Sequence, residues 1–248
     1  MIKNCQKFIS IIIPTFNEGT NSFYTETLKS LASIPDLELI IVDRSSQDQT
    51  QCLAQKYGAK VIKSTNNTRA ARLNEGIFAA TGKIILLHHP RSKIDTLCIE
   101  YLKKNYHNIS WGGLIHSFDF EHPLLKFTSW YSNNIRAKMK QILYLDHCIL
   151  FRQDLLNLSF KGKKIVPEVD IFEDTLLSFK LQKLGDPTLI PYSSKTSIIR
   201  FKKVGIFKQS FLNQVLKLAF VLGYPVKSLN KIYENDLSLN SKYISKGN

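Results

Sequence analysis

Hydrophobic and polar residues alternate with two different periods along the first half of the chain. Four short apolar runs predict strands, at Ile9–Ile13, Leu37–Val42, Ala59–Lys63 and Lys83–Leu87. Runs that are apolar at nearly every position are typical of strands buried on both faces, as in parallel sheets. Between these runs, apolar residues recur at helical spacing around Thr27–Leu31, Leu53–Tyr57 and Ala70–Ala80. This alternation predicts an α/β fold with a doubly wound, mostly parallel sheet.

The second half of the chain has a less regular pattern. It predicts strands at Trp111–Phe120 and Gln141–Phe151, and helices at Leu124–Lys138, Leu176–Leu184, Ile206–Leu222 and Val226–Tyr233. Gly185 and Pro187 follow the Leu176–Leu184 segment and form a helix stop signal. The polar end, Asn235–Asn248, is expected to fray.

Charge and composition narrow the classes of partner. The 248 residues include 34 Lys and Arg against 20 Asp and Glu, a net charge of +14 that favours anionic partners. No nucleic-acid-binding signature interleaves aromatic residues with these charges, so we expect no nucleic-acid partner. No apolar stretch reaches the ~20 residues that a membrane span needs. Four widely spaced cysteines indicate free thiols in a reducing cytosol.

Polar residues gather where the predicted parallel strands end, which is where open sheets bind ligands. Asp43 ends the second strand, and it fits either a ligand to a base or ribose or an ordinary turn aspartate. The Ser46–Gln49 segment fits a capping box that opens the second helix, so we favour a capping role for Ser46 and a dipole role for Asp48.

Two further places carry charged residues at predicted helix starts. Arg69 lies in a first turn, where a cation is disfavoured by ~0.3–1 kcal/mol, and a diphosphate would remove that penalty. The alternative is a solvated surface arginine. Glu173 and Asp174 open the Leu176–Leu184 helix, where acids are ordinary dipole partners. A carboxylate at such a place can also serve as a general base, but spacing alone favours the dipole role.

Together these segments resemble a family 2 glycosyltransferase of the compact bacterial branch. Ile11–Glu18 (IIIPTFNE) resembles the opening strand and loop of that family, and Val42–Thr50 (VDRSSQDQT) is similar to its V-D-G-x-S-x-D-G-T segment. Thr68–Gly76 (TRAARLNEG) looks like G-R-A-x-x-x-N-x-G. Phe172–Asp174, with Leu181–Pro187, is similar to the family's E-D helix that ends in L-x-x-L-G. The order and spacing of these segments make the resemblance specific.

The resemblance implies a glycosyltransferase-A type fold and an inverting transfer from a nucleotide-sugar donor. It implies that Asp174 is the catalytic base, with Glu173 beside it. The implied donor-binding residues are Pro14, Thr15, Asn17, Glu18, Asp43, Ser45, Arg69 and Arg91. Asp146, with the adjacent His147, matches a position near the sugar or the acceptor.

The sequence departs from the family where a divalent metal, Mg or Mn, would be bound. Pro90 stands where the family has a metal-binding aspartate, and proline has no ligand atom. Arg44, Gln49 and Thr68 also replace small glycines. Three explanations stay open. Arg91 supplies the missing positive charge, or His88, His89 or His147 recruits a softer metal, or the protein binds a ligand without catalysis.

The sequence therefore predicts a cytoplasmic glycosyltransferase at the inner face of a membrane, in cell-envelope polysaccharide or glycolipid synthesis. Its acceptor would be a sugar, a lipid-linked molecule or a small molecule. The alternatives are an inactive nucleotide-sugar-binding relative and, more distantly, a basic nucleic-acid-binding protein. We expect one domain over 1–235, with a nucleotide-binding half (8–108), an acceptor half (109–200), C-terminal helices (201–235) and a polar tail (236–248). The C-terminal helices either lie on an anionic bilayer or pack into the core with a solvated lysine face.

Overall fold

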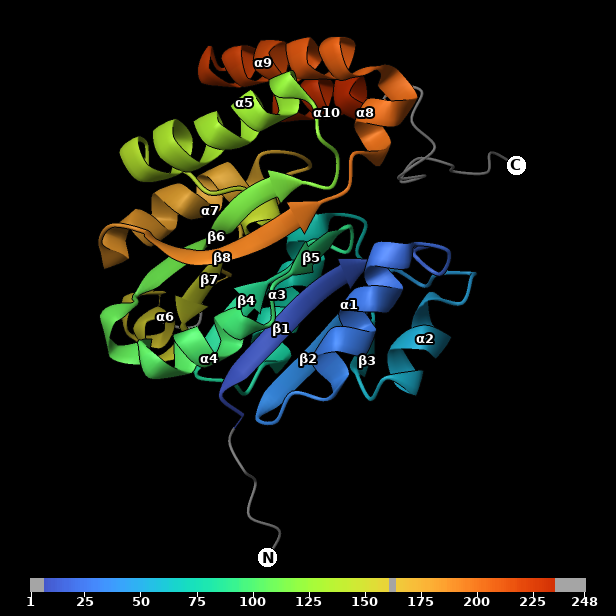
Figure 1. Cartoon of the computed structure of the whole chain (residues 1–248), viewed down its shortest axis with the longest axis vertical. Helices are drawn as coiled ribbons and strands as arrows, with labels where there is room; N and C mark the ends of the chain where they lie inside the picture. Colours follow the sequence, from blue (N-terminus) through green and yellow to red (C-terminus); the bar gives the residue numbers. More distant parts are fainter. Residues whose placement is uncertain (1–6, 161–163, 235–248) are drawn as a thin grey trace, which may run out of the picture.

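A single eight-stranded sheet organises the chain (Figure 1). The computed structural model describes residues 7–160 and 164–234. The strand order is β3-β2-β1-β4-β7-β6-β8-β5, and the strands are β1 (Ile9–Thr15), β2 (Leu37–Asp43), β3 (Lys60–Lys63), β4 (Ile84–Leu87), β5 (Ser92–Ile94), β6 (Trp111–Phe118), β7 (Leu150–Arg152) and β8 (Thr188–Thr196). The pairs among β1 to β4 and the pair β6–β8 are parallel, whereas β7 pairs antiparallel with β4 and β6, and β5 antiparallel with β8. The predicted doubly wound, mostly parallel sheet is confirmed.

Helices cover the sheet and its carboxyl end. They are α1 (Ser22–Ala32), α2 (Thr50–Lys56), α3 (Arg69–Ala79), α4 (Leu97–Lys104), α5 (Pro123–Tyr131), α6 (Gln153–Phe160), α7 (Glu173–Leu181), α8 (Ile199–Val204), α9 (Ile206–Val221) and α10 (Val226–Glu234). Short 3₁₀ turns lie at Tyr106–Asn108, Leu145–His147 and Gln182–Leu184, and α5 continues as a π-helical stretch, Ser132–Met139. Within these described residues, no helix is long and apolar enough to cross a membrane.

The apolar strands are buried on both faces, as their sequence predicts. On one face, Ile9, Ile11 and Ile13 of β1 pack with buried residues of α1 and α4. On the other face, Ile12 packs with buried residues of α3 and α7. Gly76 allows α3 to approach β1, because a Cβ there would lie 2.3 Å from Ile12 Cγ2. The sheet is thus a rigid platform whose carboxyl edge holds the loops that carry the polar residues.

One predicted strand is wrong and several elements were not predicted. Of the expected strand Gln141–Phe151, only Leu150 and Phe151 are in a strand, β7. The preceding residues form the 3₁₀ turn, and Cys148 follows it with a φ of 52°, which breaks an extended run. Strand β5 and helices α4, α6 and α8 were missed because they are short, and β8 was missed because its nine residues are mostly polar in the second half and carry no clear apolar alternation. The expected polar tail, 236–248, lies outside the described residues.

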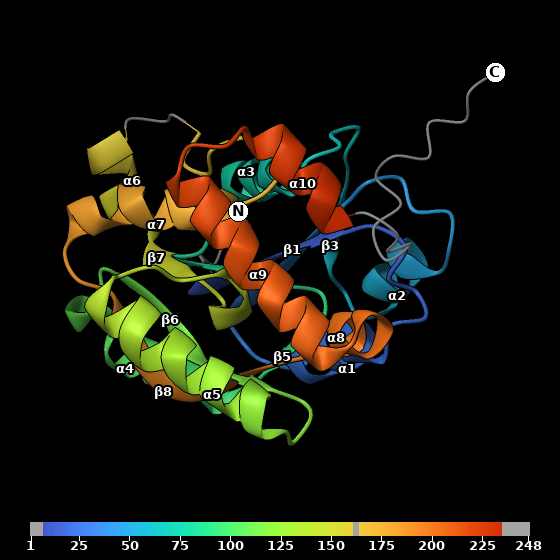
Figure 2. The ribbon, with the colours of Figure 1, turned by 90° about the horizontal axis from the view of Figure 1, so that it is seen from above.

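The C-terminal helices form a separate layer over one end of the sheet. Helices α5, α8, α9 and α10 lie together beyond the ends of β6 and β8 (Figures 1 and 2). The predicted helices at 206–222 and 226–233 correspond to α9 and α10. The cavity described next is enclosed between this layer and the carboxyl edge of the sheet.

Candidate active site

A cavity of about 260 Å³ lies at the carboxyl edge of the sheet. Its walls come from the loops after β1 and β4, the starts of α3 and α7, and the helices α8, α9 and α10. Of the residues predicted from the sequence, it gathers Pro14, Glu18, Arg69, His89, Arg91, Asp146 and Asp174. Thr15, Asn17, Asp43, Ser45, His88, His147 and Glu173 do not line it.

Asp174 is the best-placed base in the cavity. Helix α7 begins at Glu173 after Phe172, which has a φ of 65° and gives no side-chain cap. The Asp174 carboxylate accepts hydrogen bonds from the backbone N–H of Leu145 (3.2 Å) and of Thr175 (2.8 Å). Burial, together with the neighbouring charge of Glu173, raises the pKa of Asp174 to about 6. A carboxylate with that pKa can accept a proton near neutral pH.

Glu173 does not line the cavity; its carboxylate instead holds Arg69. The Arg69 Nε–H donates to Glu173 Oε1, and the Glu173 side chain is only 2% exposed. Arg69 is the first residue of α3, so the carboxylate of Glu173 supplies the negative charge that this helix start favours. The sequence predicted that a diphosphate would play this part. Because Arg69 also lines the cavity, its guanidinium is fixed at the wall by an internal partner.

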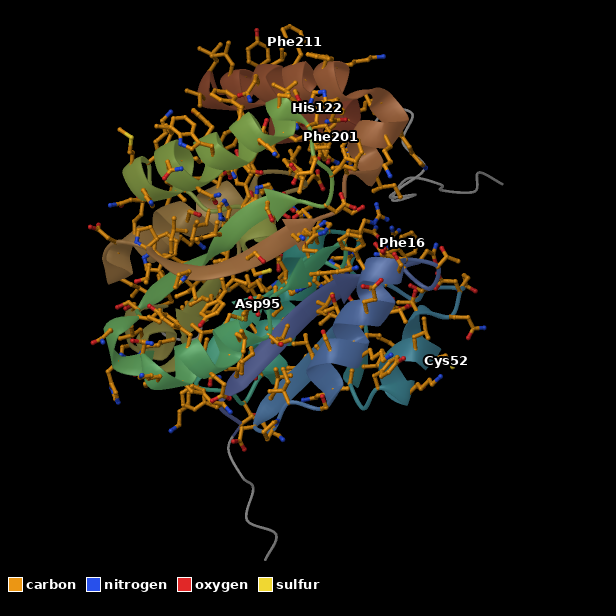
Figure 3. The ribbon with its side chains drawn as sticks, viewed as in Figure 1. Phe16, Cys52, Asp95, His122, Phe201 and Phe211 are labelled. Carbon is orange, nitrogen blue, oxygen red and sulfur yellow. The ribbon has the colours of Figure 1, made fainter. Side chains whose placement is uncertain are left out.

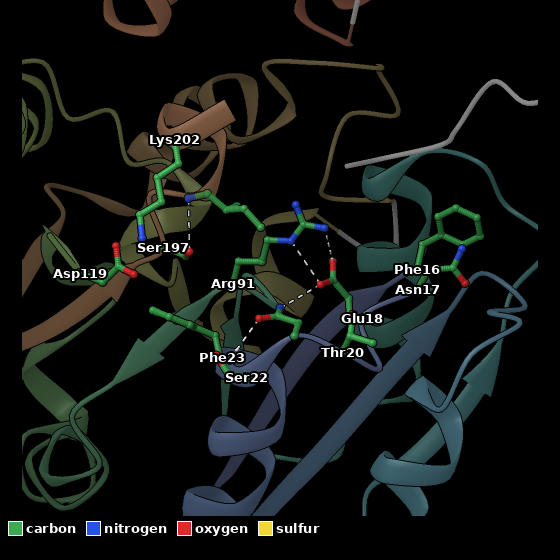
Figure 4. A pocket seen from close by; sticks show the side chains of 12 residues that line it. Phe16, Asn17, Glu18, Thr20, Ser22, Phe23, Arg91, Asp119, Ser197 and Lys202 are labelled. Atoms are coloured by element: carbon green, nitrogen blue, oxygen red, sulfur yellow. Dashed lines mark hydrogen bonds and ion pairs between the residues drawn. The ribbon is translucent and has the colours of Figure 1, made fainter. Parts of the chain in front are cut away.

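Arg91 is fixed in a similar way by Glu18 (Figure 4). Its guanidinium contacts both oxygens of Glu18, each at 3.2 Å. Asn21 donates to Glu18 Oε2 (2.8 Å) and to the carbonyl of Pro90 (3.0 Å), so it ties the β1 loop to the β4 loop. Burial raises the pKa of Glu18 although Arg91 opposes that shift. The result is a second cation anchored at the cavity wall, one residue after Pro90.

The residues after β4 do not fit a divalent metal. Pro90 has no ligand atom, and neither imidazole nitrogen of the buried His88 has a hydrogen-bond partner. His89 Nδ1 accepts from the backbone N–H of Arg91 (3.1 Å). Burial lowers the pKa of His88 to about 4 and that of His89 to about 3. No group of three His, Cys, Asp or Glu side chains that could hold a metal ion occurs within residues 7–160 and 164–234.

His147 has a role within the packing. Its Nδ1 lies 2.9 Å from the carbonyl oxygen of Leu114, and its Nε2 lies 2.8 Å from Ser132 Oγ. Its side chain is fully buried, so both ring nitrogens are engaged by protein groups. The suggestion that His88, His89 or His147 recruits a softer metal is therefore not supported by this geometry.

Asp43 is buried and organises the loop after β2. Its two oxygens accept from Thr15 Oγ1 (2.8 Å), from the N–H and Oγ of Ser46 (2.8 and 2.6 Å) and from Gln51 Nε2 (2.6 Å). This is the turn-aspartate arrangement that the sequence left open. A contact between Asp43 and a nucleotide stays a prediction, and it would require one of these donors to be replaced.

The predicted capping box is wrong. Helix α2 begins at Thr50 with Gln49 as its N-cap, and Gln49 makes no side-chain cap. Ser46 Oγ instead donates to Asp43 and accepts from the N–H of Asn17. Asp48 accepts from the N–H groups of Thr50 (3.0 Å) and Gly19 (2.7 Å), so it links the helix start to the β1 loop. Asn17 and Ser45 both have positive φ values, 52° and 47°, which turn these two loops toward one another.

Asp146 lines the cavity near the cations. Thr196 Oγ1 donates to its Oδ1 at 3.4 Å. Burial acts to raise the pKa of Asp146, but His89, His116 and Arg69 outweigh it and hold this pKa below its usual value. Asp146 therefore stays ionised beside the cavity.

Several cavity residues were missed by the sequence analysis. They are mainly basic or aromatic side chains from the first helix turns and the second half: Arg72, Arg136, Tyr144, Arg200, Lys217 and Tyr233. The one sequence signal for any of them is Lys217, a lone charge inside the otherwise apolar stretch Val215–Val221. Their convergence depends on how α5, α9 and α10 fold over the sheet.

Comparisons with known proteins match this architecture. The family model described as glycosyl transferase family 2 matches residues 10–157. No curated protein sequence is significantly similar to the chain.

Solved structures share the fold at low sequence identity. A fragment of S. aureus TarS, also solved in complex with UDP-GlcNAc, is 21% identical with a TM-score of 0.57, over 77% of this chain and 60% of that fragment. The mannosyltransferase PcManGT from Pyrobaculum calidifontis, in complex with GDP-Man and Mn²⁺, is 19% identical (TM-score 0.57; 79% of this chain, 58% of that one). Glucosyl-3-phosphoglycerate synthase from Mycobacterium tuberculosis is 16% identical (TM-score 0.56; 88% and 81%). The chain thus spans less than two thirds of the TarS fragment and of PcManGT.

Proposed function

The chain belongs to glycosyl transferase family 2, and on that basis we propose that it transfers a sugar from a nucleotide-sugar to an acceptor hydroxyl with inversion. The observation that carries this proposal is Asp174, a carboxylate with a raised pKa in a cavity that also holds Arg69 and Arg91. A base and two cations are what a displacement at a sugar carbon with a diphosphate leaving group requires.

In the proposed reaction the acceptor oxygen attacks the anomeric carbon from the side opposite the diphosphate. The bond between that carbon and the diphosphate oxygen breaks, and its electron pair stays on the leaving group. The acceptor proton passes to Asp174. One displacement of this kind inverts the anomeric centre. Proton removal by a positioned carboxylate contributes ~10²–10⁴-fold to such a reaction.

Arg69 and Arg91 are proposed to stabilise the diphosphate. Each guanidinium remains charged at any working pH and can hold two phosphate oxygens. Their internal partners Glu173 and Glu18 hold both side chains at the cavity wall before a ligand binds. Because the residues around Pro90 do not fit a divalent cation, no step is assigned to a metal. The remaining donor contacts are proposed for the β1 loop and for Asp146 at the sugar.

A thermal-shift screen of nucleotide-sugars tests donor binding, with and without EDTA. We expect one nucleotide-sugar to raise the Tm, and the shift to survive the chelator. Arg69→Ala should remove the shift, whereas Arg152→Ala, at an ion pair with Asp154 outside the cavity, should keep it. Stabilisation by nucleic acid but by no nucleotide-sugar would overturn the proposal. A donor that binds without any turnover would support the inactive relative instead.

A further inference from the structure

Helix α9 is folded with its main charged side chain turned inward. Lys217 and Asn213 line the cavity, whereas Phe211 and Leu218 of the same helix are 72% and 61% exposed. Placing a lysine in a half-buried position while large apolar residues face solvent has a free-energy cost. Two features therefore need an explanation: the lysine on the inner side of α9 and the exposed apolar residues on its outer side.

On the inner side, two cations share one aromatic ring. The Arg136 guanidinium lies 3.5 Å from the ring centroid of Tyr144, and Lys217 Nζ lies 5.6 Å from it. Neither cation forms an ion pair with a carboxylate in the described part of the chain. Arg136 Nε is buried without a hydrogen-bond partner. Burial, and next the charge of Arg136, lower the pKa of Lys217 to about 8.

This cation pair lies beside the proposed base. Tyr144 precedes Leu145, whose N–H donates to Asp174. The two cations, Arg136 and Lys217, and the Asp174 carboxylate all line the same cavity. Arg69 is attached to the start of α3 and Arg91 to the loop after β4, whereas Arg136 and Lys217 come from the helical layer opposite. The cavity thus presents cations from two walls, with Asp174 among them.

We propose that Arg136 and Lys217 bind a phosphate or carboxylate group of the acceptor, so that the acceptor is an anionic molecule whose hydroxyl faces Asp174. The inference rests on the proposed function. An anion at this place would relieve the repulsion between the two cations and satisfy the buried Nε–H of Arg136. Arg136 supplies two-point geometry, and Lys217 supplies a point charge.

Direct binding tests the anion site without any turnover. We would titrate glycerol 3-phosphate, glycerate and glycerol calorimetrically into the wild type, Lys217→Gln and Arg136→Gln. Lys208→Gln, an exposed lysine on the same helix, is the matched control. We expect the two anions to bind and glycerol not to bind. Each cavity variant should weaken anion binding ~10-fold or more, as for the loss of a charged contact, and Lys208→Gln should not.

Donor titrations separate this inference from the proposed function. Lys217→Gln should leave nucleotide-sugar affinity within about twofold and raise the KM for an anionic acceptor. Equal weakening of donor and glycerol 3-phosphate would assign the cations to the donor diphosphate and overturn the inference. Anion binding that is unchanged in both cavity variants would overturn it too. Failure of every nucleotide-sugar to bind, with the anion site intact, would overturn the proposed function alone.

The outer side of α9 carries a second, independent observation. Phe207, Phe211, Val215, Leu218 and Leu222 are all exposed and recur every three or four residues, which places them on one helix face. Figure 3 shows Phe211 on the outermost side of the molecule. Phe127 and Trp130 of the adjoining helix α5 are also more than half exposed. We call these seven residues the outer apolar face. Leu216 of α9 packs into a core cluster, as the core-packing expectation requires, but Lys217 lines the cavity and does not lie on a solvated face.

We infer that the outer apolar face docks on an anionic lipid bilayer. Helices α5 and α9 contain no Asp or Glu, and the exposed Lys208 lies among the apolar residues. Lys126 lies there too, paired with Glu121 just before α5. The chain as a whole carries +14 charges. An apolar surface with aromatic residues and more lysines than acids complements an anionic interface.

Vesicle co-sedimentation at low and high salt tests the docking. We expect binding to phosphatidylcholine vesicles that contain phosphatidylglycerol, and little binding to pure phosphatidylcholine. Phe211→Ser with Leu218→Ser should weaken binding ~10-fold or more. Phe78→Ser, an equally apolar and 94% exposed position on α3, is the control and should not. No binding to anionic vesicles at low salt would overturn the inference. So would a dimer in solution that the double variant dissociates, because a second copy would then cover the face.

Discussion

Replacing Asp174 by Asn tests both the chemistry and the energetics of the proposed base. If Asp174 accepts the acceptor proton, its loss should lower kcat by ~10²–10⁴-fold, or about 3–5 kcal/mol in the barrier. Donor affinity should stay nearly unchanged, because the lost interaction belongs to the transition state. The wild-type rate should fall as the pH drops below about 6, where Asp174 becomes protonated.

The same substitution should lower kcat but should not lower the free energy of unfolding at pH 7. The pKa of Asp174 is about 6 in the folded protein and about 4 in an unfolded chain. The folded state therefore holds the proton more tightly, and the cost of ionising the buried carboxylate develops as the pH rises from about 4 to 6. Above pH 6 the full cost is up to about 3 kcal/mol. Asp174→Asn should thus be at least as stable as the wild type at pH 7.

Rate and stability are measured on the same samples. Nucleoside diphosphate release at saturating donor gives kcat from pH 5 to 8, and urea unfolding gives the free energy of unfolding at pH 5 and pH 7. A variant with wild-type kcat would reduce Asp174 to a helix-start residue. A variant that is inactive and also much less stable at pH 7 would contradict the pKa argument.

Four other variants have defined outcomes. Arg69→Ala should weaken donor binding and also destabilise the fold by about 1–3 kcal/mol, because Glu173 keeps a buried charge without its partner; urea unfolding measures this loss. Arg69→Met with Glu173→Leu should recover stability but not donor binding, and recovery of both would remove Arg69 from the diphosphate site. Gly76→Ala should cost about 1–3 kcal/mol in the same assay, since its Cβ would meet Ile12 and Val42 at 2.3 and 3.1 Å. Arg91→Ala should lower donor affinity while EDTA does not, and strict dependence on Mn²⁺ would contradict the two-arginine proposal.

The first half of the fold could be predicted because its signals are local. A run such as Ile9–Ile13 is apolar at nearly every position, short, β-branched and ended by Pro14, which favours a strand buried on both faces. The prediction of a strand over Gln141–Phe151 was wrong because the apolar content of this segment resembles that of a strand. Its backbone instead turns so that His147 reaches the carbonyl of Leu114 on β6 and Asp146 accepts from Thr196 on β8. Sequence spacing does not carry such tertiary constraints.

For the candidate site too, the residues in local motifs could be predicted and the contacts between distant segments could not. Arg69, Arg91 and Asp174 were predicted from motifs, and the structure brings them to one cavity. Their partners Glu173 and Glu18, which lie far away in the chain, could not be paired from the sequence. Arg136 was missed because its place at the cavity depends on how the π-helical stretch Ser132–Met139 packs over the sheet. Lys217 was missed because a helix that turns a lysine toward a cavity and exposes phenylalanines contradicts the usual pattern. The proposed anion site of the acceptor rests on this unusual helix.

The proposed function stands or falls with sugar transfer in this cavity, with Asp174 as the base. The most direct measurement is the release of nucleoside diphosphate from a panel of nucleotide-sugars, each with glycerol 3-phosphate or glycerol as acceptor, by the wild type and by Asp174→Asn. We expect that one donor is consumed, faster with the phosphorylated acceptor, and at least ~10²-fold more slowly by the variant. Release from no donor, or equal rates for the two proteins, would contradict it.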